Sequence, residues 1–254
     1  MDTSPARTVV VTGAAGGIGS EIVDRFLVAG DTVVASDLSD ATLKTWRARW
    51  DTDAAGGRNE RLHTVPADIA SEDSVAAFAD TIRQRFGAAD VLINNAGFFS
   101  HTLFEEMSTE EWRRILDINL TGTFLMIRAF VPLMKEGGRG RIVNIGSGSV
   151  HNGTPQQAHY VAAKAGVMGL SRVLARELAQ YGITVNLLTP GLTITPMTAG
   201  VLPEPLLEMQ RNLRSFHRDE TPADLVGTIF FLASEDAAFL TGQTLNVDGG
   251  LYFV

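Results

Sequence analysis

Short apolar runs alternate along this chain with longer segments of helical periodicity. Runs of about five residues in such an alternation are typical of parallel strands joined by right-handed helical crossovers. We therefore expect an α/β fold, in which a doubly wound, seven-stranded parallel sheet carries helices on both faces. The runs are TVVVT (8–12), TVVAS (32–36), LHTV (62–65), DVLIN (90–94), RIVNI (141–145), TVNLL (184–188) and TLNV (244–247).

Two helix starts have specific signals. Ser108 followed by Glu111 has the pattern of a capping box, in which each residue bonds the other's backbone. Thr221 before Pro222 predicts an N-cap with proline in the first helical position.

The chain shows no Pro/Ser-rich linker, charge block or internal repeat, so we expect a single domain over residues 1–254. Two segments lack a regular pattern. Residues 52–61 are expected to form a surface loop, and residues 195–205 lie beyond the end of a strand.

Composition excludes several function classes. The formal net charge is -8, from 21 basic and 29 acidic residues, which argues against general affinity for nucleic acid or an anionic membrane. There is no cysteine, and the first residues resemble neither a signal peptide nor a membrane span, so we expect a cytoplasmic protein. None of the five histidines has a metal-binding spacing, and we expect no catalytic metal.

The first apolar run leads into a glycine-rich turn, TGAAGGIGSEIVDRF, in which Gly13, Gly17 and Gly19 separate a strand from a helix. Such a turn lets the backbone approach a pyrophosphate at the helix N-terminus. The simpler alternative is a tight turn whose glycines only supply positive φ. Asp37 favours the first interpretation, because it ends the second run, 18 residues after Gly19, where a carboxylate can bind an adenosine ribose.

Five motifs together resemble the short-chain dehydrogenase/reductase family, and the match extends from about Thr8 to the final NVDGG (246–250). The resemblance implies a Rossmann fold, a nicotinamide dinucleotide and hydride transfer between an alcohol and a carbonyl compound. The motifs are TGxxxGxG (12–19), Asn94-Asn95-Ala96-Gly97, Ser147, Tyr160-x-x-x-Lys164 and Pro190-Gly191.

The resemblance assigns four catalytic residues. Tyr160 would be the general acid/base, Lys164 would hold the nicotinamide ribose and lower the phenol pKa, and Ser147 would bind the substrate oxygen, with Ser149 as a nearby rival. A free phenol has a pKa near ~10, so a cation beside it would make proton transfer feasible near neutral pH. Asn119 matches the fourth residue, which implies an irregular helix and a water chain from Lys164 to solvent.

The resemblance also implies the cofactor contacts. Asp68 would bind adenine, Asn95 would support the central sheet, and Thr195 would reach the carboxamide or a phosphate. Position 193 is usually Ile or Val in the family, and this chain has Thr. The full predicted set is Thr12, Gly13, Gly17, Ile18, Gly19, Asp37, Asp68, Ile69, Asn95, Ala96, Gly97, Tyr160, Lys164, Pro190, Gly191, Thr193 and Thr195.

We expect the cofactor to be NAD. Asp37 would repel the 2'-phosphate of NADP. Relatives that use NADP commonly offset this charge with a basic residue just after this position or just before the second motif glycine, and those positions here are Leu38 and Gly16.

The loops after the strands must select the substrate. The segment 195–217 carries apolar residues between turn residues, which suggests a mobile lid over an apolar substrate; an oligomer contact is the alternative. The stretches 141–190 and 241–248 resemble family members of the pyridoxal 4-dehydrogenase and 1-phenylethanol dehydrogenase types, which act on aryl carbinols. Candidate pocket residues are Phe98, Ser149, His151, Gln156, Met197 and Leu202.

The leading hypothesis is thus an NAD-dependent alcohol dehydrogenase or carbonyl reductase for a small secondary or aryl carbinol. One alternative is a 3-oxoacyl-[acyl-carrier-protein] reductase, which would favour NADPH and a basic patch for the acidic carrier. Another is a non-catalytic NAD-binding regulatory protein. An enoyl reductase usually spaces its Tyr and Lys by more than four residues. The resemblance further implies a homotetramer, with interfaces on the helices around 109–135 and 157–180 and on the C-terminal strand.

Overall fold

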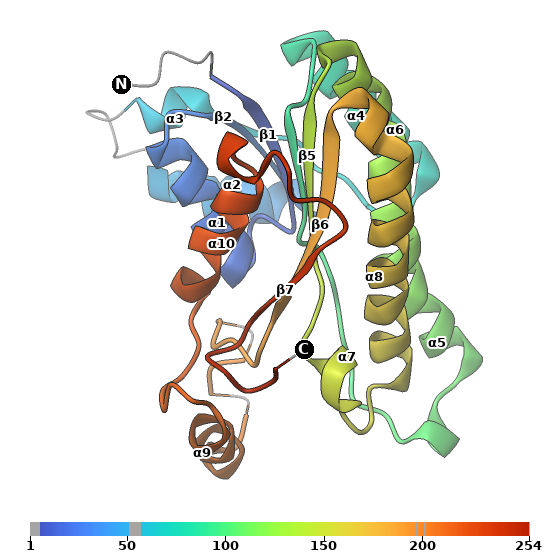
Figure 1. Ribbon diagram of the computed structural model, residues 1–254, viewed down its shortest axis with the longest axis vertical. Helices are drawn as coiled ribbons and strands as arrows, with labels where there is room; N and C mark the ends of the chain where they lie inside the picture. The colour runs from blue at the N-terminus through green and yellow to red at the C-terminus, as the bar shows by residue number, and fades with distance from the viewer. Residues whose placement is uncertain (1–5, 51–56, 197, 201, 254) are drawn as a thin grey trace.

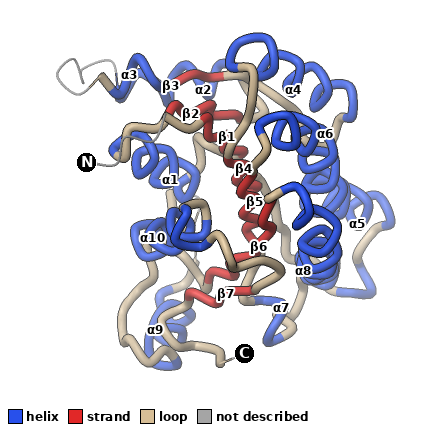
Figure 2. Tube along the Cα trace, turned by 45° about the horizontal axis from the view of Figure 1, so that its top comes forward, coloured by secondary structure: helices blue, strands red, loops and turns tan. Residues whose placement is uncertain are grey.

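Seven parallel strands form one sheet in the computed structural model, among the residues it describes (6–50, 57–196, 198–200 and 202–253). Figure 1 shows the whole chain, and Figure 2 labels the strands in their order β3-β2-β1-β4-β5-β6-β7, which confirms the expected doubly wound α/β fold. The strands are β1 (Thr8–Thr12), β2 (Thr32–Ser36), β3 (Leu62–Thr64), β4 (Val91–Asn94), β5 (Gly140–Ile145), β6 (Ile183–Pro190) and β7 (Thr244–Val247).

The strands follow the apolar runs of the sequence closely. β5 and β6 are buried along their whole length, as expected for strands covered on both faces. β6 is longer than predicted, because its last residues Thr189 and Pro190 pair with Asn246 and Val247 of β7. β1 pairs with β2 on one side and β4 on the other, so the winding direction reverses there. Folds of this type bind ligands outside the strand ends at this reversal.

Helices cover both faces of the sheet (Figure 2). On one face α1, α2 and α10 bury side chains such as Phe26, Leu43 and Ile229. On the other face α4, α6 and α8 surround Phe78 and Phe130. The helices are α1 (Gly17–Val28), α2 (Asp40–Arg47), α3 (Arg58–Arg61), α4 (Glu72–Phe86), α5 (Thr109–Leu116), α6 (Gly122–Gly137), α7 (Ser149–Asn152), α8 (Ala158–Leu178), α9 (Glu204–Leu213) and α10 (Pro222–Leu232).

α5 starts with half of the predicted capping box. The Ser108 side chain accepts the N–H of Glu111 at 3.0 Å, as expected. The Glu111 carboxylate is instead turned toward Ser100 and Thr102, whose hydroxyls both donate to it at 2.6 Å. The reciprocal bond predicted from the spacing is wrong, because tertiary partners compete for this carboxylate.

Two segments predicted to be irregular contain helices. Arg58–Arg61 forms α3 within the predicted surface loop, and residues 52–56 of that loop lie outside the described residues. Glu204–Leu213 forms α9 within the predicted lid. The start of α10 agrees with the sequence: Thr221 is the N-cap, and Asp224 Oδ2 accepts its N–H at 2.8 Å and its hydroxyl at 3.0 Å.

The helical run Thr109–Gly137 contains a π-helical stretch, η3 (Asp117–Thr121), between α5 and α6. In the part of the chain that the structure describes, this run is the one helix with the length and apolar composition of a membrane span, and 50% of its most apolar window is buried inside the fold. Core helices of water-soluble proteins meet the same criterion. The π-turn places Asn119 inside the protein, fully buried.

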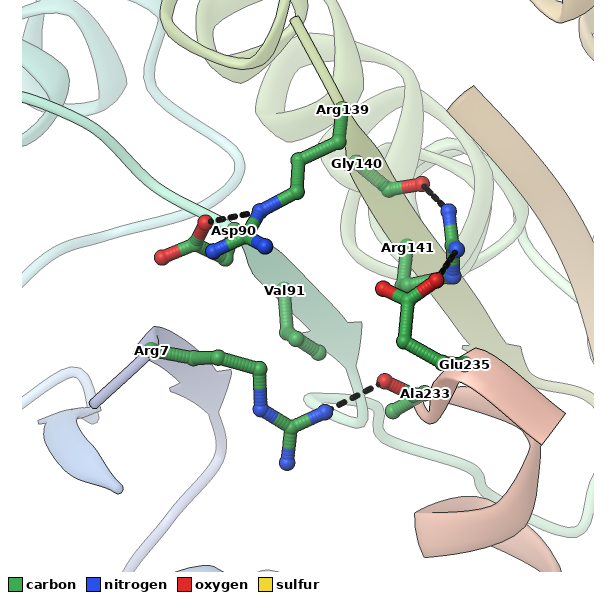
Figure 3. Close-up of a pocket in the computed structure, with 8 residues that line it drawn as sticks. All are labelled: Arg7, Asp90, Val91, Arg139, Gly140, Arg141, Ala233 and Glu235. Carbon is green, nitrogen blue, oxygen red and sulfur yellow. Dashed lines mark hydrogen bonds and ion pairs between the residues drawn. The ribbon is translucent and has the colours of Figure 1, made fainter. Parts of the chain in front are cut away.

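A small hollow lies at the amino ends of β4 and β5 (Figure 3), the edge of the sheet opposite the glycine turn. Its lining is highly charged, but the charges neutralise one another. These contacts hold the strand ends together and are separate from the site described below. The three ion pairs are Arg7 with Asp31, Arg139 with Asp90, and Arg141 with Glu235.

Candidate active site

The turn between β1 and α1 is too tightly packed for side chains. Gly13 has a φ of +62°, and a Cβ there would lie 2.8 Å from Cα of Ala96. A Cβ at Gly19 would lie 2.1 Å from the carbonyl oxygen of Gly13. A Cβ at Gly17, the first residue of α1, would lie 2.8 Å from Cβ of Thr195. The turn therefore has the close backbone approach and the helix N-terminus that suit a dinucleotide pyrophosphate.

Thr12 and Asn95 bind this turn to the end of β4. Thr12 Oγ1 accepts the N–H groups of Asn95 and Ala96, each at 3.1 Å. Asn95 Nδ2 donates to the carbonyl oxygens of Thr12 at 2.9 Å and Gly13 at 3.0 Å. These four bonds hold the two strand ends together where the winding reverses, which agrees with the supporting role expected for Asn95.

Asp37 lies at the end of β2 beside the glycine turn. Its carboxylate accepts the N–H of Ala15 at 3.1 Å and that of Leu38 at 2.9 Å. The first bond fixes the carboxylate against the turn, on the side where an adenosine ribose is expected. Leu38 is exposed and apolar, so no cation at that position offsets the charge of Asp37.

Two other predicted cofactor residues have different surroundings. Asp68 is exposed, and its carboxylate accepts the N–H of Ala70 at 2.9 Å. Ile69 is buried against α6, where a Cβ on Gly122 would lie 3.0 Å from its Cδ1. The Ile69 side chain therefore belongs to the core, and only its backbone is left for a cofactor contact.

Thr193, the departure from the family pattern, bonds to a buried charged pair. Its hydroxyl donates to Oε1 of Glu220 at 2.6 Å, and Oε2 of Glu220 lies 3.6 Å from Nη2 of Arg214. Both charged side chains are under 5% exposed, and burial raises the pKa of the Glu220 carboxyl. A Cβ on Gly191 would lie 2.7 Å from Glu220 Oε2. The Thr193 hydroxyl is thus used within the protein, and Glu220 and Arg214 are site neighbours that the sequence analysis missed.

Ser147, Tyr160 and Lys164 meet beyond the carboxyl end of β5. Ser147 follows this strand, and the other two lie one turn apart at the start of α8. The Tyr160 hydroxyl is hydrogen-bonded to Ser147. Lys164 Nζ lies 5.6 Å from the centroid of the Tyr160 ring and donates to the carbonyl oxygen of Ile145 at 2.8 Å. The structure thus brings together the three residues that the sequence singled out.

Asn119 lies next to this group in the π-helix. Its Nδ2 donates to the carbonyl oxygens of Phe98 at 2.7 Å and Ile115 at 3.0 Å. A Cβ on Gly97 would lie 2.8 Å from Asn119 Oδ1 and 3.4 Å from Lys164 Nζ, so only a glycine fits between the two side chains. The helix irregularity implied by the resemblance is present at the expected residue.

Burial controls the protonation of Tyr160 and Lys164. It raises the pKa of Tyr160 to about 12, against the opposing effect of the Ser147 hydrogen bond. It lowers the pKa of Lys164 to about 8. In the protein alone, desolvation of the phenolate is the largest influence on this pKa. The lowering of the phenol pKa by Lys164 together with an oxidised nicotinamide stays a prediction. The phenol stays protonated near neutral pH and can donate a proton.

The two phenylalanines that follow Gly97 have different partners. The Phe99 ring lies 5.8 Å from the Tyr160 ring, centroid to centroid, and 5.6 Å from the His101 ring. Phe98, the residue named from the sequence, lies with its ring 4.9 Å from the guanidinium of Arg114. Phe99 is therefore the aromatic neighbour of Tyr160, and no spacing signal in this loop could have separated the two.

The candidate substrate-pocket residues that follow β5 also have different partners. Ser149 Oγ donates to Ser147 Oγ at 2.8 Å and so lies at the catalytic group. His151 Nε2 lies 3.4 Å from Thr189 Oγ1. Gln156 is exposed and has a φ of +64°. Of these three, only Ser149 contacts Ser147.

The predicted lid, 195–217, lies at the same end of the sheet as α7 (Figure 1). Leu202 is partly buried, and Met197 lies outside the described residues. Arg211 is paired with both Glu204 and Asp219. Several apolar side chains remain exposed on this segment: Met209 (47%), Leu213 (60%) and Phe216 (69%).

Comparisons with known proteins agree with this geometry. A family model described as "Enoyl-(Acyl carrier protein) reductase" matches residues 13–252. A 3-oxoacyl-[acyl-carrier-protein] reductase of Synechocystis is 39% identical over 252 residues, which cover 99% of each chain. A reductase of the same name from Thermotoga maritima is 34% identical over 96% of this chain and 97% of its own. The structure of a short-chain type dehydrogenase/reductase from Mycobacterium ulcerans superposes with a TM-score of 0.90 at 28% identity, over 96% of this chain and 89% of that one.

The sheet order, the glycine turn and the grouping of Ser147, Tyr160 and Lys164 lead to the same conclusion as the similar proteins. The residues at the carboxyl ends of β1 and β2 fit a nicotinamide dinucleotide: a backbone cradle for the pyrophosphate and a fixed carboxylate beside it. The chain belongs to the short-chain dehydrogenase/reductase family and is an oxidoreductase that uses a nicotinamide dinucleotide.

Proposed function

We propose that this protein interconverts a carbonyl compound and its alcohol, with Tyr160 as the proton donor and acceptor. The hydrogen bond between Tyr160 and Ser147 beside the buried Lys164 supports this proposal. A nicotinamide dinucleotide held at the glycine turn would supply the hydride for the carbonyl carbon in reduction and would accept it in oxidation. In reduction Tyr160 gives its proton to the carbonyl oxygen while Ser147 hydrogen-bonds that oxygen, and in oxidation the proton returns to Tyr160.

Replacing Tyr160 with Phe tests this role, because it removes the hydroxyl and keeps the ring. Turnover should fall by at least ~100-fold, the usual contribution of acid/base catalysis, while NADH binding followed by fluorescence should survive. Tyr181→Phe is the matched control, since this tyrosine lies in the 3-10 turn that follows α8 and is 39% exposed. Near wild-type turnover in the Tyr160 variant would rule the mechanism out.

We propose NAD as the preferred cofactor. The Asp37 carboxylate is fixed against the glycine turn by the N–H of Ala15. A carboxylate there can accept hydrogen bonds from both ribose hydroxyls of NAD, whereas the 2'-phosphate of NADP would bring like charge to the same place.

For the substrate, the names of the similar proteins favour a 3-oxoacyl thioester. This substrate class, the alternative that the sequence analysis names, is the first candidate. A small aryl carbinol is the second candidate, supported by the Phe99 ring beside Tyr160. One observation speaks against a carrier-protein substrate. Arg211 and Arg218 on the predicted lid are both paired with carboxylates, so neither is a free cation for an acidic carrier protein.

Two carbonyl probes separate the candidates. With NADH in excess, acetoacetyl-coenzyme A tests the 3-oxoacyl thioester and acetophenone tests the aryl ketone. A thioester reductase should show the higher kcat/KM with acetoacetyl-coenzyme A. Preference for acetophenone would restore the aryl carbinol hypothesis.

We also propose that the chain forms a homotetramer. Small residues on one face of α8 are exposed, namely Ala162, Ala165 and Gly169, and Val173 continues this strip one turn later, 53% exposed. Phe124 on α6 is 40% exposed. Such a strip allows close helix approach between copies. Light scattering at micromolar concentration should give a mass four times that of the chain, and a monomer would contradict the proposal.

A further inference from the structure

The helix that carries Tyr160 starts without an ordinary cap. The N-cap residue of α8, Gln157, makes no side-chain capping bond. The first N–H groups of any helix have no acceptor within it, and the N–H of Tyr160 is one of them. It donates to Nδ1 of His159 at 2.8 Å. The acceptor usually provided by Ser, Asp or Asn comes here from the residue before the proposed acid/base.

This bond determines the protonation of the imidazole. A backbone N–H can only donate, so Nδ1 must be unprotonated and Nε2 must carry the proton of a neutral ring. Nε2 lies 3.1 Å from Ser100 Oγ and 3.4 Å from Oε1 of Glu111. His159 is fully buried, so these contacts account for both nitrogens of a ring that water does not reach.

The hydrogen-bonded chain continues from His159 to a carboxylate. Ser100 Oγ donates to Oε1 of Glu111 at 2.6 Å, and Thr102 Oγ1 donates to the same oxygen at 2.6 Å. These hydroxyl bonds hold the pKa of Glu111 below its usual value. The chain thus runs from the first turn of α8 through His159 and Ser100 to Glu111 on α5.

The same chain controls the loop that carries Phe99. Ser100 and Thr102 belong to this loop, and the Phe99 ring packs against Tyr160 at 5.8 Å. His159 therefore holds the backbone of Tyr160 on one side and, through Ser100, the loop that borders its ring on the other.

We propose that His159 is a positioning residue for the reaction: it caps the first turn of α8 and so sets the place of the Tyr160 hydroxyl relative to Ser147 and the Phe99 loop. This inference rests on the proposed acid/base role of Tyr160. His159 does not contact the phenol itself, and it acts through the backbone of its neighbour.

Three substitutions of His159 test separately its contact with the Tyr160 N–H and its contact with Ser100. In His159→Asn the amide oxygen occupies the place of Nδ1, so the variant can keep the bond to Tyr160 N–H but is too short to reach Ser100. In His159→Gln the amide reaches the place of Nε2 and loses the bond to Tyr160 N–H. In His159→Leu the side chain branches at Cγ as in histidine but has no polar atom, so the variant loses the contacts with both the Tyr160 N–H and Ser100.

We expect His159→Leu and His159→Gln to lower kcat about tenfold, the effect of misplacing a group through one lost hydrogen bond. The KM for NADH should not change, because the glycine turn and Asp37 are untouched. His159→Asn should restore kcat to within about threefold of the wild-type value. Acetoacetyl-coenzyme A and acetophenone serve as the two probes.

Hydrogen exchange of the Tyr160 amide provides a readout that needs no turnover. Exchange should be fast in the Leu and Gln variants and slow in the wild type and the Asn variant. His63→Leu, at the opposite edge of the sheet on β3, is the matched control for loss of a histidine and should change neither readout.

The outcomes separate this inference from the proposed function. Wild-type kcat in a folded His159→Leu, or equal losses in the Asn and Leu variants with the same melting temperature, would overturn the positioning role. If His159→Leu does not fold, Ser100→Ala must still lower kcat without changing NADH binding, and an unchanged kcat would count against the network. Full activity of Tyr160→Phe would instead overturn the catalytic proposal.

Discussion

Two regions at the carboxyl edge of the sheet, the glycine turn with its neighbours and the segment around α9, are built in different ways. On the cofactor side, backbone groups and short side chains make the contacts: Asn95 bonds the glycine turn, and Asp37 accepts the N–H of Ala15. On the substrate side, the segment around α9 leaves Leu213 and Phe216 60% and 69% exposed. One side is closely packed, and the other presents apolar surface to solvent.

This difference explains why the family could be assigned but the substrate could not. A turn in which a Cβ at Gly19 would lie 2.1 Å from a carbonyl oxygen tolerates few sequences, so its motif is recognisable. Exposed apolar side chains at loop positions tolerate many substitutions. We therefore expect the cofactor side to carry the chemistry that the family shares, and the segment around α9 to carry what is specific to this protein.

The largest effect is expected on the cofactor side, in the preference for NAD over NADP. At about 5 Å and an effective dielectric near ~20, one pair of like charges costs about 3 kcal/mol. The kcat/KM for NAD should therefore exceed that for NADP by ~100-fold. Asp37→Ala should reduce the ratio of the two kcat/KM values, chiefly because the variant binds NAD more weakly. Equal use of both cofactors by the wild type would show that Asp37 does not face the ribose.

Lys164, where the two sides meet, should give the next largest effect. Burial lowers its pKa from 10.5 to about 8. Between these values the unfolded chain binds more protons than the folded chain, so the free energy of unfolding should rise with pH, by at most ~1.4 kcal/mol per unit. Urea titrations at pH 8 and 9.5 measure this rise, and Lys164→Met should abolish it. A wild-type curve parallel to that of the variant would contradict the shift.

A pair of glycines tests whether close packing matters on the cofactor side. Gly19→Ala should weaken NADH binding by at least about tenfold, because the turn must open to admit the methyl group. Gly227→Ala is the matched control: it also lies in a helix, α10, and nothing lies within 4 Å of the added Cβ. Fluorescence titration with NADH measures the affinity of both variants. Equal affinities would show that close packing of the glycine turn does not matter for cofactor binding.

The smallest effect is expected on the substrate side. Phe216→Ser on the lid should raise the KM for the better carbonyl probe about threefold to tenfold by removing exposed apolar surface, with no change in NADH affinity. Steady-state kinetics with the substrate varied at saturating NADH measures it. A change in NADH affinity with no change in the KM for the carbonyl probe would show that this segment contacts the cofactor and not the substrate.

Much of the fold could be predicted because local patterns and tertiary packing agree. The run TVVVT is β1 without a change of boundary, since apolar side chains on both faces suit a buried parallel strand. β6 exceeded its apolar run at Thr189 and Pro190, because pairing with β7 extends the strand beyond its local pattern. α9 was missed because its apolar residues, read among turn residues, did not suggest a helix.

The parallel sheet, the glycine turn and the placement of Tyr160 and Lys164 on one helical face follow from the sequence alone, because each depends on residues close together in the chain. The neighbours that these groups contact depend on the tertiary packing. Glu111 has the spacing of a capping residue, yet it bonds Ser100 and Thr102. Phe99 rather than Phe98 faces Tyr160, and Thr193 donates to Glu220, 27 residues away. Local spacing carries no information on such contacts, since side-chain direction in loops and the choice of hydrogen-bond partner depend on how distant segments pack.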